Sequence, residues 1–554
     1  MKFTAAVLFA TLSLVTASDT ALRGTEVGDD ATSRLLKKKT MKPKTMKPKK
    51  TMKPKKTRKP KKTRKPKTMK PKKTRKPKET GAPTVSPTEA PVIPPTEAPV
   101  IPPTDAPTVS APSCAVTEPP TSAPYVFESR FVPGSSSVSY GGQIARHLLI
   151  GLQKGAIGGV TAGGAPGDAE SEILFYYDCP GAGGCENEST GVSVEPPLTV
   201  TQATIGEVST GKDLNGKIAG NDPIGQHKDW DTEFRGWNDW SAVAPRSPEN
   251  LVRRWAAVVD GLAQNVGNDP SGDPITKAFV SPQGQDYQQL IQKFVLGAVA
   301  FSQGADDYLD NDTAGKGLLA DNTGIAKEGV TYTALEHAWD EGYGYFGGAV
   351  DFLEYTDDEI AGKGGRDGWS EGYHDADENG EIDLKSEKNY GHSLNAAKRD
   401  RGSVTGCSDL TSEAYDGFYR GRALITAAGG ALTPGQMDEL VGYRDAAVGA
   451  WEKAIAATVI HYINDCLFDI AQQPELDFYG YAKHWSEAKG FSLSFQFNRL
   501  SPVSDEDFDT LQALLRDAPE LDPASFAAWE ADLLEARGIL EAAYGFDAED
   551  VAAW

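Results

Sequence analysis

A short run of alternating acidic and amide residues is the part of this sequence best suited to a defined chemistry. Asp375, Asp377 and Asn379 occupy alternate positions, and Gly380 follows them directly. Calcium takes about six to eight oxygen ligands, and a tight loop of the EF-hand type supplies them from alternate residues around a glycine turn. The spacing therefore predicts a calcium loop.

The second half of this loop departs from the standard pattern. We expect Glu381 to offer its backbone carbonyl, Ile382 to point inward and Asp383 to act through water. Ser386 stands at the twelfth position, where an EF-hand has a bidentate Glu, and Glu387 follows it. We expect Glu387 to substitute, with a weaker affinity suited to extracellular calcium. The predicted ligands are Asp375, Asp377, Asn379, Glu381, Asp383 and Glu387. The alternative is an acidic surface turn that binds no ion.

Three histidines are each followed by a carboxylate three or four residues later, which places both groups on one face of a helix. The pairs are His337 with Glu341, His461 with Asp465, and His484 with Glu487. Imidazole and carboxylate ligands suit zinc or iron. None of the pairs forms the His-Glu-x-x-His motif of zinc peptidases, so core or hydrogen-bonding histidines are the alternative.

A second acidic cluster, Asp306, Asp307, Asp310 and Asp312, has no fixed glycine, and we interpret it as a solvated face. The sequence has no phosphate-binding loop, no Gly-x-Ser-x-Gly elbow and no dinucleotide fingerprint. No catalytic residue is assigned, and a non-enzymatic protein is the preferred interpretation.

Helical periodicity dominates the sequence after residue 125 and predicts an all-α, bundle-like fold. The expected helices cover residues 143–153, 248–266, 285–302, 332–353, 412–428, 434–472, 505–517 and 523–544. Thr433-Pro434 and Asp522-Pro523 are expected helix starts. A Gly-rich, irregular insertion is expected at about 154–245, and its residues 192–202 have the clearest strand pattern.

Charge divides the chain into two unlike parts. Residues 37–78 hold 24 of the 57 Lys and Arg residues and no acid, in seven copies of Thr-(Met/Arg)-Lys-Pro-Lys. Regular proline and mutual repulsion predict a disordered, cationic arm. From position 125 onward, 30 basic and 69 acidic residues give a net charge of −39. We expect this acidic part to attract cations and to repel nucleic acid.

The N-terminus has the features of a secreted protein. Residues 1–17 combine Lys2, a short apolar run and a small-residue cleavage site, which predicts a signal peptide. Residues 18–36 form a propeptide-like segment, and residues 79–124 a Pro/Thr-rich linker before the acidic helical domain 125–554. No stretch is apolar for the roughly 18 residues of a spanning helix, so no membrane anchor is expected.

Cysteine usage fits an oxidising compartment, either extracellular or at a cell wall. A disulfide is expected between Cys179 and Cys185, which flank a short glycine turn. Cys407 and Cys466 are candidates for a second disulfide, which would leave Cys114 without a partner in the chain.

Several strings in the acidic part resemble a family of bacterial secreted proteins and lipoproteins known as domain of unknown function 4856. They are residues 137–143, 336–346, 395–400 and 483–491. Because the family has no assigned activity, the resemblance implies one domain without a catalyst. The chain is also distantly similar to imelysin-type proteins, which implies metal binding or peptidase activity. Ala482 stands where their Gly-x-His-x-x-Glu motif has Gly.

The arm resembles the lysine-rich segments of silaffin-type wall proteins of algae. Arg34-Leu35-Leu36 is similar to the processing site of such precursors. The resemblance implies attachment through residues 37–78 to a polyanionic wall polymer, an acidic polysaccharide or silica.

Three hypotheses about function follow. The first is a secreted, non-enzymatic calcium-binding protein, anchored to a polyanionic matrix by its cationic arm. The second is an imelysin-like metal-binding protein or metallopeptidase. The third is a structural protein of a silica or wall matrix.

Overall fold

The computed structural model describes residues 122–180, 184–222, 226–240 and 246–554. We call these residues the helical body. They belong to one compact unit, Thr104–Trp554. The predicted signal peptide, propeptide-like segment and cationic arm, and the linker up to residue 121, lie outside the described residues.

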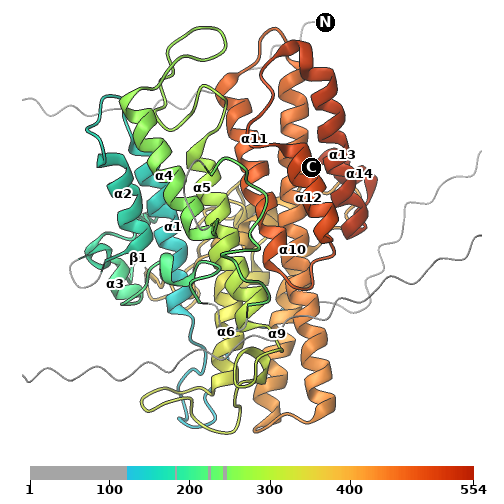
Figure 1. Cartoon of the computed structure of the whole chain (residues 1–554). Helices are drawn as coiled ribbons and strands as arrows, with labels where there is room; N and C mark the ends of the chain where they lie inside the picture. Colours follow the sequence, from blue (N-terminus) through green and yellow to red (C-terminus); the bar gives the residue numbers. More distant parts are fainter. Residues whose placement is uncertain (1–121, 181–183, 223–225, 241–245) are drawn as a thin grey trace, which may run out of the picture. The chain divides into compact units, whose positions relative to one another are not determined.

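The helical body is all-α, as predicted. It contains fourteen α-helices, and its only named strands are the two-residue strands β1 (Thr199–Val200) and β2 (Glu381–Ile382). The strands pair in parallel, with Thr199 opposite Glu381 and Val200 opposite Ile382. Most of the helices run roughly alongside one another (Figure 1). The predicted strand at residues 192–202 is therefore confirmed only at its last few residues.

Helix α10 (Pro434–Ala471) is the longest element and contacts α8, α9, α11, α13 and α14. It begins as predicted, with Pro434 in the first turn and a capping box between Thr433 and Gln436. Small residues allow close packing, because a Cβ on Gly417 of α9 would lie 2.8 Å from the Ala447 backbone nitrogen. The partner helices are α8 (Gly391–Asp400), α9 (Leu410–Ala428), α11 (Phe478–Ser492), α13 (Phe526–Tyr544) and α14 (Ala548–Ala553).

A second group of helices is formed by the earlier part of the body. Helix α1 contacts α2, α5 and α6, and α5 also contacts α11 of the first group. The bounds are α1 (Gly141–Gly159), α2 (Asp168–Asp178), α4 (Pro248–Gln264), α5 (Tyr287–Val295) and α6 (Ala334–Phe346). The remaining helices are α3 (Ile205–Val208), α7 (Asp357–Ile360) and α12 (Asp505–Leu515). Beyond α5 the chain continues in π-helical turns, η3 (Leu296–Phe301) and η4 (Gly304–Tyr308).

Helix α6 passes close to its neighbours because of its glycines. A Cβ on Gly342 would lie 2.8 Å from Leu309, and one on Gly344 would lie 2.6 Å from Tyr140. Such contacts are shorter than van der Waals separations, so these positions exclude larger side chains. The helix begins at a capping box between Thr333 and Glu336.

Helices α2, α8 and α11 were not among the expected segments. Helix α2 lies within the predicted irregular insertion, and α8 carries many polar residues. Helix α11 is buried over most of its surface, so it has no polar face to show periodicity. The other predicted helices are confirmed within a few residues, apart from two ends. Helix α1 continues to Gly159, beyond the predicted end at 153 and into the predicted irregular insertion. Helix α6 stops at Gly347 in the left-handed region, before the predicted end at 353.

The cysteines follow the sequence prediction in part. Cys179 and Cys185 form the expected disulfide, with Cα atoms 5.1 Å apart. Cys466 is a free, buried thiol, whereas Cys407 is disulfide-bonded. The candidate bridge between Cys407 and Cys466 is therefore wrong, because Cys466 is buried in the core near the C-terminal end of α10.

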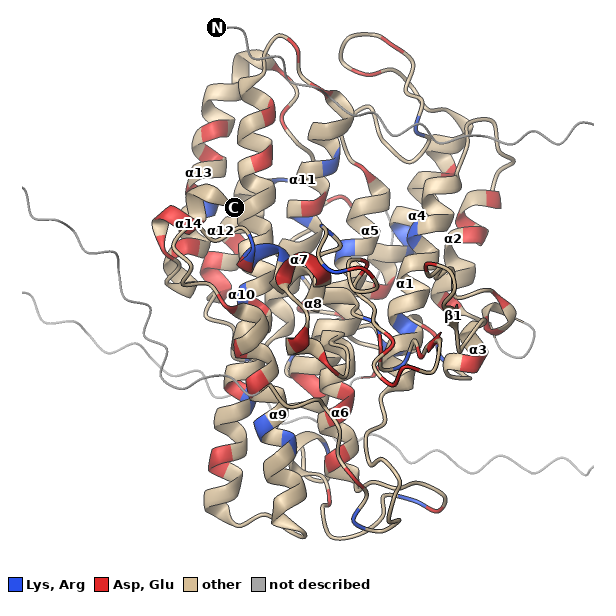
Figure 2. Ribbon diagram, turned by 180° about the vertical axis from the view of Figure 1, so that it is seen from behind, with Lys and Arg blue, Asp and Glu red and all other residues tan. Residues whose placement is uncertain are grey.

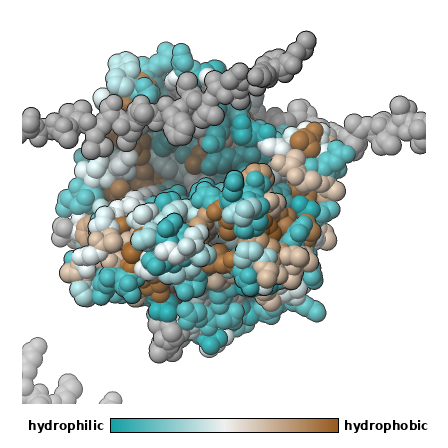
Figure 3. All heavy atoms as spheres, turned by 90° about the horizontal axis from the view of Figure 1, so that it is seen from above, coloured by the Kyte–Doolittle hydropathy of each residue, from teal (hydrophilic) through white to brown (hydrophobic). Residues whose placement is uncertain are grey.

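The surface carries scattered apolar residues. Large exposed apolar side chains such as Val126, Val404 and Phe468 come from separate segments. Hydrophobic atoms on the face drawn in Figure 3 are likewise interspersed with hydrophilic ones. Within the described part, helix α10 is long and apolar enough to cross a membrane, but 61% of its most apolar window is buried in the protein. A core helix of a bundle meets the same criterion.

Candidate metal centre

Two backbone contacts close the base of the predicted calcium loop. Tyr373 and Lys388 form an isolated antiparallel bridge, and the His374 amide donates to the Glu387 carbonyl at 3.1 Å. Ile382 is fully buried, as predicted, and its strand β2 pairs with β1. The buried apolar residue fixes the loop to the core and leaves its polar residues on one side.

Three carboxylates converge inside this loop. One oxygen each from Asp375, Asp377 and Glu387 lie within 4.8 Å of one another. Two ligands of the same calcium ion, bound at about 2.3–2.6 Å, are separated by at most about 5 Å. The separations of the three carboxylate oxygens are therefore compatible with a shared calcium ion.

Backbone amides hold the first ligand in place. The carboxylate of Asp375 accepts the Asn379 amide at 3.0 Å and the Gly380 amide at 2.8 Å. Gly380 has φ of +87° and Glu378 has φ of +57°, so the chain reverses direction here through left-handed backbone. These amides turn the loop around the Asp375 carboxylate, as expected from the glycine position.

Glu387 spans the loop from the far side. Its Oε1 accepts the Ala376 amide at 2.9 Å, and its Oε2 accepts the Asp383 amide at 2.7 Å. Burial, and then the charges of Asp377 and Asp375, raise the pKa of Glu387, while its two backbone hydrogen bonds lower it. A bound cation would relieve the repulsion among the three carboxylates.

The other predicted ligands are arranged differently. The Asn379 side chain bonds within the loop, to Asp377 at 3.0 Å and to the Glu381 amide at 2.7 Å. Asp383 accepts from Gln202 at 2.8 Å and is not one of the three converging carboxylates. The carbonyls of Gly380 and Ile382 accept hydrogen bonds from the amides of Thr199 and Thr201. Because carbonyls alternate in direction along a strand, the Glu381 carbonyl points away from this segment.

The chemistry of this donor set fits calcium. All of its ligand atoms are hard oxygens, and the side chains of Asp375 and Asp377 are partly or fully exposed to incoming ions. Among the described residues, no lysine or arginine forms an ion pair with the three carboxylates. Their negative charge is thus free to attract a cation.

His337 lies apart from the other two predicted histidine sites. Its Nδ1 faces the Ser139 carbonyl at 3.0 Å, and its Nε2 lies 3.7 Å from Glu341. The ring stacks on Tyr332 at a centroid distance of 4.3 Å. This pair exists as the helical spacing predicted, but His461 and His484 do not join it.

His461 and His484 face the same carboxylate across two helices. The Nε2 atoms lie 3.4 Å and 3.8 Å from Asp465 Oδ2. The other ring nitrogens are occupied, because His461 Nδ1 lies 2.8 Å from the Trp554 carbonyl and His484 Nδ1 lies 2.7 Å from Asp469. The sequence pattern placed these histidines in separate pairs, whereas the fold brings them together.

The predicted pairing of His484 with Glu487 is wrong. Glu487 lies 3.2 Å from Lys293 and 3.5 Å from Lys483, both of which are cations that it neutralises. His484 instead contacts the two acids of α10, Asp465 and Asp469, which lie one turn apart and share a face.

Three acids of the second acidic cluster are buried, so its interpretation as a solvated face is wrong for them, whereas Asp312 is exposed. Asp306, Asp307 and Asp310 are each at most 5% exposed. Each has a nitrogen partner in the structure, namely the His227 ring for Asp306, Lys316 for Asp307 and Arg499 for Asp310. Asp306 and Asp307 lie in the π-helical turns of η4, and Asp310 follows them. Burial raises the pKa values of all three acids, to about 6 for Asp310.

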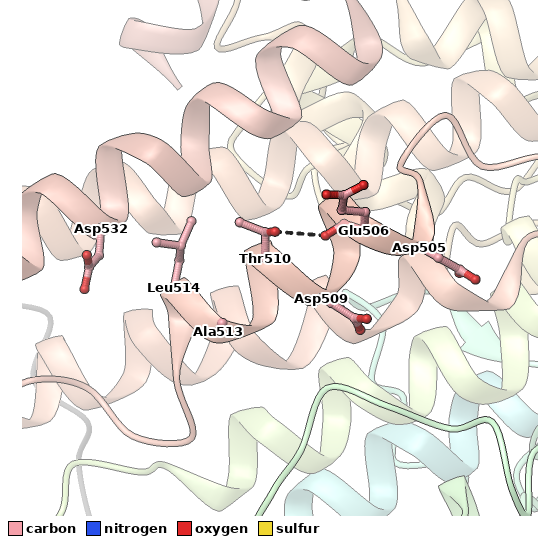
Figure 4. A pocket seen from close by; sticks show the side chains of 7 residues that line it. All are labelled: Asp505, Glu506, Asp509, Thr510, Ala513, Leu514 and Asp532. Carbon is pink, nitrogen blue, oxygen red and sulfur yellow. Dashed lines mark hydrogen bonds between the residues drawn. The ribbon is translucent and has the colours of Figure 1, made fainter. Parts of the chain in front are cut away.

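An acidic depression between α12 and α13 is also visible, but its carboxylates do not converge (Figure 4). Asp505 and Asp509 pair with Arg235, and Asp532 pairs with Arg516. The Thr510 hydroxyl donates to the Glu506 carbonyl within its own helix at 2.9 Å. These side chains form surface ion pairs and not a metal site.

One family model matches the chain. Residues 248–358 match the family described as Domain of unknown function (DUF4856), which confirms the predicted family resemblance over this stretch. The match covers α4, α5 and α6 and ends before the candidate calcium loop. No curated protein and no solved structure matches the chain. The imelysin and silaffin resemblances stay predictions.

Proposed function

We propose that this chain is a secreted, non-enzymatic calcium-binding protein of a cell surface or wall. Part of the chain matches a family of unknown function, which leaves this proposal open. The observation that carries the proposal is the convergence of Asp375, Asp377 and Glu387 within 4.8 Å. Three hard, anionic ligands held by backbone amides around a glycine turn form a site that selects calcium over softer ions.

Calcium would connect parts of the fold that are distant in sequence. Strand β2 inside the loop pairs with β1 near residue 200, and Gln202 donates to Asp383. At the end of the loop, the Val350 amide donates to the Ser386 carbonyl at 2.6 Å. An ion bound by the loop therefore stabilises contacts with both segments, which explains how a non-enzymatic domain would use it.

The cationic arm supplies the proposed attachment. Residues 37–78 contain 24 Lys and Arg residues and no acidic residue, whereas the chain from 125 onward has a net charge of −39. Acidic residues are likewise spread over most elements of the helical body (Figure 2). The arm is thus the part suited to an acidic polysaccharide or silica, through attraction that salt weakens.

Calcium titration of the full chain by calorimetry tests the site. Wild type should bind one ion at the loop, and Asp375→Asn and Glu387→Gln should each weaken binding at least about tenfold, or about 1.4 kcal/mol. Glu381→Gln is the matched control, because it removes the same charge from the same loop but leaves the backbone carbonyl. Equal binding by all four proteins would overturn the proposal.

Deletion of residues 37–78 tests the attachment. The shortened protein should lose binding to silica particles or to an acidic polysaccharide, while its calcium binding is unchanged. Raising the salt concentration from 0.05 to about 0.5 M should release the full chain, because the Debye length falls well below about 10 Å. Retention of the deleted protein on these surfaces would contradict an anchoring role for the arm.

A second candidate function is transition-metal binding of the imelysin type. It is favoured because His461 and His484 both face Asp465. With Nδ1 of each ring on an acceptor, Nε2 is left to bind a metal. The ligand atoms of the three residues do not all lie within 4.8 Å, so the imidazoles would have to close on the ion. Stoichiometric zinc or iron in the purified protein, lost in His461→Ala, would support this function.

A further inference from the structure

A cavity of about 690 Å³ opens beside the first turn of α1 and is separate from the calcium ligands Asp375, Asp377 and Glu387. Its walls come from Val350 and from four segments, at about 125–143, 208–212, 327–341 and 383–386. A hollow assembled from so many segments is a feature of the folded body and not of one surface loop.

Three lysines from three of these segments line the cavity. They are Lys212, Lys327 and Lys385. In the described part of the chain, none of them forms an ion pair, although the chain from 125 onward has more than two acids for each base. Lysines in such an acidic protein would ordinarily be paired on the surface, so this grouping leaves a local excess of positive charge inside the cavity.

Two of the lysines lie directly over the start of α1. The Lys212 side chain lies 2.8 Å from the position that a Cβ would occupy on Gly142. The Lys385 side chain lies 3.3 Å from the corresponding position on Gly141. The missing side chains of both glycines thus make room for the lysines. The first turn has no acidic residue and no side-chain cap, so its amide groups add to the positive potential.

The negative groups of the cavity are already engaged. Glu341 accepts from the Gln143 side chain at 2.7 Å and lies 3.7 Å from His337. Asp383 accepts from Gln202 at 2.8 Å and from the Lys385 amide at 3.0 Å. Neither carboxylate forms an ion pair with a cavity lysine, so the three ammonium groups remain available to a ligand.

Burial lowers the pKa of Lys212 and the positive charge of Arg146 lowers it further, while the negative charge of Glu341 raises it. An anion beside Lys212 would offset both effects. An aromatic wall adds apolar contact, since Tyr332 is 7% exposed and stacks on His337.

We propose that this cavity binds a small organic anion, with its phosphate, sulfate or carboxylate group at Lys212, Lys327 and Lys385 and its remainder against Tyr332. Three flexible ammonium groups recognise such oxyanions as point charges and do not require one geometry. This site goes beyond the proposed calcium function, because it uses none of the three converging carboxylates.

Lysine footprinting of the full chain tests the site and separates it from the cationic arm. The protein is labelled with an amine-reactive reagent in inorganic phosphate, in sulfate, in acetate or in chloride at equal ionic strength, and each lysine is quantified by mass spectrometry. Labelling of Lys212 and Lys385 should fall several-fold in at least one of the three oxyanions relative to chloride. Exposed Lys277, outside the cavity, should be labelled equally in all four.

A variant shows whether protection comes from a shared ligand. Lys327→Met should reduce the protection of Lys212 and Lys385 by the effective anion, whereas Lys277→Met should leave it unchanged. Unprotected cavity lysines, or equal protection of Lys277, would overturn the proposal. The wild-type footprint needs no variant to fold, and the calcium titration of the same protein reports separately on the proposed function.

Discussion

The Oε2 atom of Glu387 accepts the backbone amide of Asp383 at 2.7 Å, across the loop that joins them. The other oxygen of Glu387 accepts the Ala376 amide at 2.9 Å, so one carboxylate joins both halves of the loop. This geometry explains how a glutamate one position later than in a standard EF-hand reaches the ligand group. Ser386 at the twelfth position is instead engaged through its carbonyl with Val350.

Glu387→Gln is expected to weaken calcium binding more than it disturbs the fold. The amide keeps one acceptor but loses the negative charge and the second acceptor. The affinity for calcium should fall at least about tenfold, and the calcium-free protein should lose about 1 kcal/mol of stability. Calorimetry and urea unfolding measure the two effects. A variant with unchanged affinity would remove Glu387 from the ligand set.

Calcium is expected to raise the stability of the folded chain. At a free concentration of 100 times the dissociation constant, binding to the folded state alone adds about 2.7 kcal/mol. Urea unfolding with calcium or with a chelator measures this difference. Asp375→Asn should abolish it and Glu381→Gln should preserve it. Equal stabilisation of both variants would place the ion elsewhere.

Glu452 is expected to make stability depend on pH. Burial raises the pKa of this carboxyl to about 7, against hydrogen bonds from Ser501, Asn498 and Tyr544 that lower it. Because the folded pKa lies above the unfolded value, its contribution is complete below pH about 4.5 and is lost as pH rises through 7. Glu452→Gln should therefore be more stable than wild type at pH 8, by on the order of 3 kcal/mol.

The comparison at pH 4 checks the sign. There the carboxyl of Glu452 is protonated in both states, and the variant and wild type should have similar free energies of unfolding. A variant that is no more stable at pH 8 than at pH 4, relative to wild type, would contradict a buried carboxyl with a raised pKa.

Arg422 is expected to be essential for the stability of α9. Its side chain is fully buried, with Asp340 at 2.8 Å, Glu336 at 3.4 Å and the Ser137 hydroxyl at 2.7 Å. Arg422→Met would leave buried Asp340 without its cation and Glu336 with only Arg130 at 3.5 Å, which costs about 3–5 kcal/mol. Urea unfolding measures this loss. Arg420→Met, on the same helix in a part-exposed pair with Asp416, should cost at most about 1 kcal/mol.

The turn of the candidate calcium loop was predictable from sequence because the residues that form it are local. Asp375, Asp377 and Gly380 lie within six residues, so their spacing alone determines the turn. The departure at Ser386 was visible too, but the way in which Glu387 replaces it depends on hydrogen bonds to Ala376 and Asp383 that spacing does not encode.

Features assembled from distant segments were harder to predict. Helical spacing paired His461 with Asp465, but only the packing of α10 against α11 brings His484 to the same acid. Charge alone suggested that Asp306 is solvated, whereas the π-helical turns direct it inward. Lys212 and Lys385 are separated by more than 170 positions, so no local pattern links them.

A crystal structure of the full chain grown with millimolar calcium tests the central claim most directly. We expect one ion inside the 375–387 loop, with oxygens of Asp375, Asp377 and Glu387 and the Glu381 carbonyl at about 2.3–2.6 Å. Anomalous scattering at long wavelength identifies the ion as calcium. A loop of the same conformation that holds only water at this calcium concentration would contradict the account.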